Sequence, residues 1–141
     1  MENFASAAAR HWDNAQFLGA DDRWQEAAYL AGYIAECSLK ALLECTAPDM
    51  LLRPLGHDLA ALAGEALEMA VLLNPGSRRY PAAALLPGAV GVGRWQPEHR
   101  YEQTGFLSDG EFQQMVTEAQ QIGQSVLVAL VLDGVVEEAP L

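Results

Sequence analysis

The sequence has few basic residues and no long hydrophobic run. Its 141 residues contain 8 Lys and Arg against 19 Asp and Glu, a formal net charge of -11. This balance argues against a protein that coats nucleic acid non-specifically, because such binding needs many cations against phosphates. The most continuous apolar stretches, 39–43, 70–73 and 126–132, fall far short of the roughly 20 residues that cross a bilayer. The first residues lack the positive flank and apolar run of a signal peptide. We therefore expect a soluble, cytoplasmic protein that does not enter a membrane.

Cysteine is scarce, and metal-ligand patterns are missing. Cys37 and Cys45 lie eight positions apart in one predicted helix, so about 12 Å separates them and they cannot form a disulfide there. We expect both to be reduced packing residues. No His, Cys, Asp or Glu cluster has the spacing of a metal site, and Walker loops, dinucleotide-binding glycine fingerprints and serine nucleophile elbows are also missing. We expect neither a metal ion nor another cofactor.

The hydrophobic pattern has the period of helices, and no segment shows the period-2 alternation of a sheet. Four main helices are predicted, at residues 3–18, 23–45, 58–73 and 109–132. At 51% hydrophobic content, a chain of this length fits one domain with one core. We therefore predict an all-α antiparallel bundle of four main helices, with a single domain over 1–133 and a short tail over 134–141.

Helix starts and buried faces are also predicted. Asp22 with Gln25, and Ser108 with Glu111, have the spacing of capping boxes that begin the second and last helices. The predicted buried face of the first helix is Phe4, Ala8, His11, Ala15 and Leu18. That of the last helix is Phe112, Met115, Val116, Ala119, Ile122 and Val126. His11, on the apolar face of the first helix, is expected to be a core or interface residue with a satisfied hydrogen bond.

The 23–45 helix is apolar around most of its circumference, which is typical of a central helix. The end of the last helix, 126–132, is apolar on every side and must be covered. Twofold pairing is the commonest way to cover such a surface. We therefore predict a homodimer, with the 23–45 and 109–132 helices as the favoured interface.

Positive charge is concentrated in residues 75–101. This stretch holds four of the eight basic residues and one acid, Glu98. Four prolines and five glycines predict a long loop over 75–107, and long loops in compact domains are commonly functional. If a surface receives a phosphate or nucleotide, we expect it to include this segment.

Several short motifs occur in an order that resembles one family. They are Trp-Gln-Glu-Ala-Ala at 24–28, Ala-Glu-Cys-Ser-Leu-Lys-Ala-Leu-Leu at 35–43, Gly-His-Asp-Leu at 56–59 and Trp-Gln-Pro-Glu-His-Arg-Tyr at 95–101. Over about residues 5–132 the chain resembles a HEPN domain (higher eukaryotes and prokaryotes nucleotide-binding). The resemblance implies a helical nucleotide- or RNA-binding module that pairs with itself, or partners a minimal nucleotidyltransferase in a toxin-antitoxin or defence locus. The family also includes ribonucleases and inactive relatives, so the resemblance does not fix the activity.

Arg94 and His99 have the spacing of the Arg and His of HEPN ribonucleases. An imidazole can move the proton of a 2'-hydroxyl or leaving group, and an arginine can stabilise phosphorane charge without a metal. Pro97 disfavours a continuous helix between the two residues, whereas the family motif lies at a helix start. A metal-independent endoribonuclease is therefore one alternative, and a surface-loop salt bridge is the other.

The remaining candidates are binding residues. Arg100 and Tyr101 match the Arg-Tyr of the last motif, where guanidinium would bind phosphate and the ring would stack a base or pack the loop. The alternative is a loop anchor in which Trp95 and Tyr101 are buried against the bundle and Arg100 caps a helix C-terminus. His57 either starts a helix or lines a cleft with Glu36 and Lys40, which form an i, i+4 pair. The predicted nucleotide- or phosphate-binding set is Arg78, Arg79, Arg100, Tyr101, His57 and Lys40. A plain protein-interaction scaffold remains a third possibility, because the chain outside the loop is strongly acidic.

Overall fold

The computed structural model describes residues 3–46, 59, 62 and 95–132, and every regular element in this part is helical. The elements are α1 (Phe4–Ala20), α2 (Trp24–Thr46), the 3-10 helix η4 (Pro97–Tyr101) and α6 (Asp109–Leu132). The all-α prediction is confirmed for these residues. Most of the predicted 58–73 helix lies outside them; Leu59 and Leu62 are both helical and buried in the core. Four-helix topology therefore stays a prediction.

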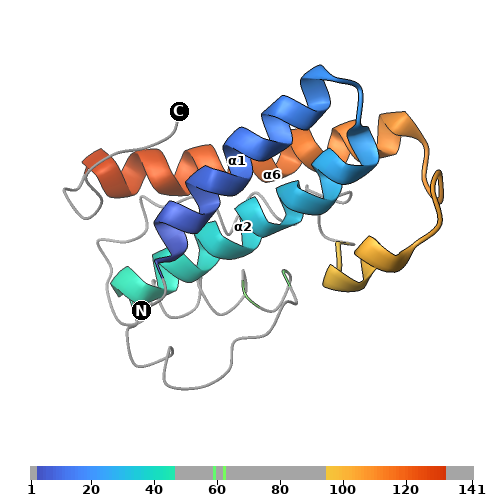
Figure 1. The fold of residues 1–141 in the computed structure, drawn as a ribbon. Helices are drawn as coiled ribbons and strands as arrows, with labels where there is room; N and C mark the ends of the chain where they lie inside the picture. Colours follow the sequence, from blue (N-terminus) through green and yellow to red (C-terminus); the bar gives the residue numbers. More distant parts are fainter. Residues whose placement is uncertain (1–2, 47–58, 60–61, 63–94, 133–141) are drawn as a thin grey trace.

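The second helix, α2, is the centre of the described structure. Figure 1 shows α1 and α2 running in opposite directions, with α6 starting at the same end as α2. Both α1 and α6 pack extensively on α2 and make little contact with each other. Along α2 the side chains from Ile34 to Leu39 are all buried, including Glu36 and Ser38. The predicted central position of this helix is confirmed.

One of the two predicted capping boxes is present. The Ser108 hydroxyl accepts from the Glu111 N–H at 3.2 Å, and the Glu111 carboxylate accepts from the Ser108 N–H at 3.4 Å. The prediction of a capping box at Asp22 and Gln25 is wrong. Asp22 takes a left-handed conformation with φ 57°, and the Gln25 side chain bonds instead to the backbone of residues 103 and 105.

The buried face of α1 is rotated from the predicted one. Ala8 and Ala15 are buried as expected, but Trp12 and Gly19 join them. Phe4, His11 and Leu18, also on the predicted face, are only partly buried. On α6 the six predicted inward residues are all buried, so that face is confirmed.

Trp95 locks the segment before η4 onto α2. Its side chain is 2% exposed, and its indole N–H donates to the carbonyl of Tyr29 at 3.0 Å. The ring lies directly on Gly32, where an added Cβ would overlap the indole. A glycine at this position of α2 therefore allows the tryptophan to reach the helix backbone.

Cys37 is buried, in agreement with the predicted packing role, while the Cys45 side chain lies outside the described residues. Within the described part of the chain, no helix combines the length and apolar character needed to span a membrane.

Candidate functional site

The candidate site is built on the 95–107 segment, which contains η4 and leads into α6. Two contacts with α2 hold the segment: Trp95 on Gly32, and the side chain of Gln25. The Gln25 amide donates to the carbonyl of Gln103 at 3.2 Å and accepts from the N–H of Gly105 at 2.9 Å. A single side chain therefore satisfies both backbone groups of this turn and fixes its distance from α2.

His99 stabilises the start of η4. Pro97 is the first residue of this helix, where a proline loses no hydrogen bond. The Gln96 N–H donates to Nδ1 of His99 at 3.4 Å, and the His99 N–H donates to the carbonyl of Gln96 at 3.0 Å. The loop prediction is therefore wrong at 97–101, because Pro97 begins a short helix. In the neutral imidazole, an accepting Nδ1 leaves the proton on Nε2.

Arg100 and Tyr101 form an exposed pair at the end of η4. The guanidinium carbon of Arg100 lies 4.7 Å from the centroid of the Tyr101 ring, and that ring is 76% exposed. Hydrogen bonds to Tyr29 and then Tyr101 raise the pKa of Arg100, so it is fully charged. Among the described residues, no carboxylate forms an ion pair with this guanidinium. The alternative in which Tyr101 is a buried anchor is wrong, whereas Trp95 does have that role.

A cavity of about 240 Å³ lies beside this pair, between η4, α2 and the start of α6. His99, Arg100 and Thr104 line it from one side, and Tyr29 and Gln25 from the other. Its apolar wall is formed by Phe106, Phe112 and Met115. The lining also includes two carboxylates, from Glu26 and Glu102. The cavity thus offers both hydrogen-bond donors and acceptors, while positive charge is confined to the Arg100 side.

The structure brings only some of the predicted site residues together. His99, Arg100 and Tyr101 are adjacent, but Lys40 lies on α2 eleven positions beyond Tyr29, about 16 Å along the helix axis. Lys40 pairs with Glu36 at 3.2 Å and is largely buried, so it is not part of the cavity. Arg78, Arg79, Arg94 and His57 lie outside the described residues.

Sequence reasoning missed the aromatic cluster of His11, Tyr29, Tyr33 and Trp95. The Tyr33 ring stacks on His11 with centroids 5.2 Å apart and meets the edge of Trp95 at 4.7 Å. The Tyr29 and Tyr33 hydroxyls lie 3.3 Å apart. Burial, followed by this hydrogen bond, raises the pKa of Tyr33, which therefore stays protonated. The i, i+4 spacing of the two tyrosines on α2 could have indicated that their side chains lie next to each other.

His11 has no hydrogen-bond partner for its buried Nδ1 within the described residues, contrary to the expected satisfied histidine. Burial, with a smaller effect of Arg10, lowers the pKa of His11, and Glu36 opposes this shift. The folded protein thus binds the proton less well than the unfolded chain does, whose histidine pKa is about 6.5.

We expect this histidine to destabilise the fold in acid. Stability should be fully present above about pH 6.5 and should fall as the pH drops below it, because protonation favours the unfolded chain. Replacing His11→Phe keeps a ring against Tyr33 and should flatten the pH dependence in this window. Urea unfolding of both proteins at about pH 7.5 and 5.5 measures the change in the free energy of unfolding across this window. An unchanged slope in the variant would assign the acid sensitivity to other groups.

Comparison with known proteins gives no match to this chain among protein-family models, curated proteins or solved structures. The resemblance to HEPN domains therefore rests on the sequence motifs alone.

Proposed function

We propose that the chain is a HEPN-like module that binds a nucleotide or single-stranded RNA through Arg100 and Tyr101. The observation that carries the proposal is the exposed guanidinium stacked on an exposed tyrosine ring beside a cavity. Guanidinium groups bind phosphate with charge-assisted hydrogen bonds, and exposed aromatic rings stack bases. The two side chains together match one phosphate and one neighbouring base.

The charges of the cavity define the orientation of the ligand. Glu26 and Glu102 line the cavity and repel phosphate, so the phosphate binds on the outer, solvent-facing side of Arg100. The same carboxylates accept hydrogen bonds from ribose hydroxyls or base amino groups. The sugar or base thus faces the cavity, and the phosphate stays outside.

Removing the guanidinium should weaken RNA binding clearly. We expect Arg100→Ala to raise the dissociation constant for a short single-stranded RNA about 10- to 100-fold, because a hydrogen bond to a charged group contributes about 1.5–3 kcal/mol. Loss of one phosphate contact should also reduce the slope of log affinity against log salt by about one. Fluorescence anisotropy with labelled RNA at several salt concentrations measures both quantities.

Two further variants complete this test. Tyr101→Ala should weaken binding with little change in the salt slope, since it removes stacking and no charge. Arg10→Ala is the matched control, because Arg10 is an exposed arginine on α1 away from the site. Equal losses in the Arg10 and Arg100 variants would show only a general charge effect and would contradict the proposed site.

Ribonuclease activity is the second candidate, because His99 lines the cavity beside Arg100. The hydrogen bond that Nδ1 of His99 accepts from the backbone favours a binding module over a ribonuclease. It leaves the proton of neutral His99 on Nε2, so that this nitrogen can donate a hydrogen bond but cannot act as a base. We therefore expect no RNA cleavage in EDTA. Cleavage that disappears in both His99→Ala and Arg94→Ala would establish the enzyme instead.

The proposal extends to partners. Of the two helices predicted to pair in a homodimer, α2 is largely enclosed by its neighbours, whereas α6 exposes Gln114, Gln121 and Gln124. A homodimer would then use α6, and a nucleotidyltransferase-type protein is the heterologous partner that the family resemblance implies. A protein-interaction scaffold without a nucleic-acid ligand is the outcome if RNA fails to bind.

A further inference from the structure

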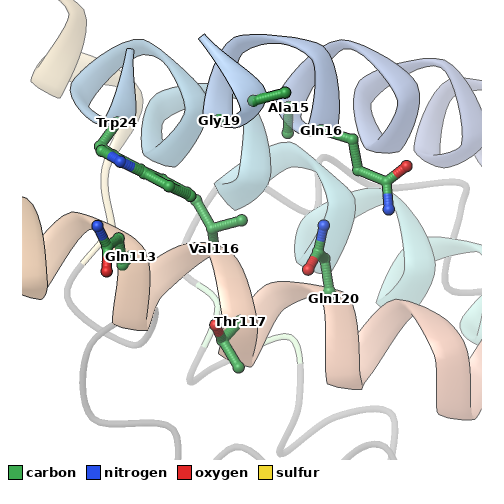
Figure 2. A pocket seen from close by; sticks show the side chains of 9 residues that line it. Ala15, Gln16, Gly19, Trp24, Gln113, Val116, Thr117 and Gln120 are labelled. Atoms are coloured by element: carbon green, nitrogen blue, oxygen red, sulfur yellow. The ribbon is translucent and has the colours of Figure 1, made fainter. Parts of the chain in front are cut away.

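A second pocket, which shares no lining residue with the first, lies between α1 and α6. Its volume is about 440 Å³, within the roughly 300–1,000 Å³ of typical ligand pockets. It exists because α1 and α6 both pack on α2 and leave a space between themselves. Trp24, at the start of α2, closes one end, as Figure 2 shows. The 240 Å³ cavity is lined by the next residue, Gln25, so the two pockets lie on different faces.

None of the described residues that line this pocket has an ionisable side chain, although the protein has a net charge of -11. Its polar groups are the amides of three glutamines and one hydroxyl: Gln16, Gln113, Gln120 and Thr117. Figure 2 shows Gln16 reaching down from α1 and Gln120 reaching up from α6 into the space between the helices. Each amide presents two donors and an acceptor. The pocket therefore suits an uncharged ligand with hydrogen-bonding edges.

The apolar part of the pocket suits a flat ring. The indole of Trp24 runs from the start of α2 toward Val116, and both side chains line the pocket. Aromatic rings favour flat, conjugated partners that can stack offset or meet their edge. An ionised ligand would gain no counter-charge from these residues, and an anion would also be repelled by the net charge of the protein.

We infer that the α1–α6 pocket binds a small, uncharged, planar molecule that carries an amide or lactam group. The ring packs against Trp24 and Val116, and the amide exchanges hydrogen bonds with the glutamines, Gln120 above all. This site is independent of the nucleotide or RNA contact proposed at Arg100.

The test uses a matched pair of probes, nicotinamide and nicotinate, which differ in one charge. Titration is followed by NMR at the indole N–H of Trp24, assigned with a Trp24→Phe variant, and uridine serves as a larger lactam probe. We expect nicotinamide or uridine to shift this signal at millimolar concentration and to leave Trp95 unaffected. Nicotinate should bind at least about tenfold more weakly, because its carboxylate finds no cation.

Two glutamines on α6 provide the variant and its control. Gln120 lines the pocket, whereas Gln121 is exposed and does not. Gln120→Leu should weaken the binding probe about 3- to 10-fold through the lost hydrogen bonds, and Gln121→Leu should leave it unchanged. Arg100→Ala should also leave it unchanged, which separates this site from the RNA site.

Three results would overturn the inference. They are no shift with either neutral probe at tens of millimolar, equal binding of nicotinate, and unchanged affinity in Gln120→Leu. Should that variant fail to fold, Ala20→Leu fills the same pocket from α1 and is expected to abolish binding.

Discussion

Replacing Gly32→Ala is expected to lower the free energy of unfolding by about 2–4 kcal/mol, although alanine is the better helix former. The helical preference alone would stabilise the protein by about 0.5–1 kcal/mol. The new methyl group, however, would overlap the ring of Trp95, which is buried and cannot move aside without losing its bond to the Tyr29 carbonyl. Overpacking of this kind costs about 1–3 kcal/mol, and expelling the indole costs more.

Urea unfolding followed by circular dichroism measures this effect, and thermal unfolding should show a midpoint about 10 °C lower. Gly110→Ala is the matched control, because a Cβ there meets only the Ser108 hydroxyl at 3.9 Å, so it should stabilise α6 slightly. A double-mutant cycle with Trp95→Ala tests the cause. In that background Gly32→Ala should cost little, and an undiminished cost would mean that the clash lies elsewhere.

Replacing Lys40→Met is expected to cost about 2–4 kcal/mol. Lys40 reaches Glu36 at 3.2 Å, and the side chains are only 14% and 3% exposed. Methionine keeps the apolar stem of Lys40 but leaves a buried carboxylate without its ammonium partner. Breaking a buried pair from one side commonly costs about 3–5 kcal/mol. The contact of Lys40 with the Phe4 ring, at 5.7 Å, is lost as well.

Arg23→Met is the control for this experiment. It breaks the Arg23–Asp21 pair, at 2.8 Å, whose side chains are 67% and 65% exposed. Exposed pairs contribute about 0–1 kcal/mol, so little change is expected. The double variant Glu36→Gln with Lys40→Met should recover part of the loss, because the buried charge is gone. If Lys40→Met unfolds like the wild type, the pair is dispensable.

Features set by neighbouring residues could be predicted from the sequence. The Ser108 and Glu111 box, the inward face of α6 and the Glu36–Lys40 pair all depend on spacings of three or four within one helix. The predicted box at Asp22 failed because Gln25 bonds to backbone groups 78 and 80 positions away. No local pattern contains that information.

In the candidate site, too, local patterns could be predicted from the sequence and contacts between distant segments could not. The motif around His99, Arg100 and Tyr101 could be found because it is contiguous. Burial of Trp95 was one of the predicted alternatives, but its partners Tyr29 and Gly32 could not be found, since they depend on how a distant segment packs on α2. Pro97 was expected to disfavour a continuous helix between Arg94 and His99, and residues 95 and 96 are indeed not helical. A proline at the first position is also a helix starter, and that role was not predicted.

The order in which these contacts occur along the chain affects the folding rate. Three residues join α1 to α2, so this hairpin closes with little loss of chain entropy. Trp95 reaches its acceptor on α2 across 66 positions, and that loop must close before the contact stabilises anything. The α1–α2 hairpin is therefore the natural folding nucleus. Substitutions within it should slow folding, whereas those in the 95–107 segment should mainly speed unfolding.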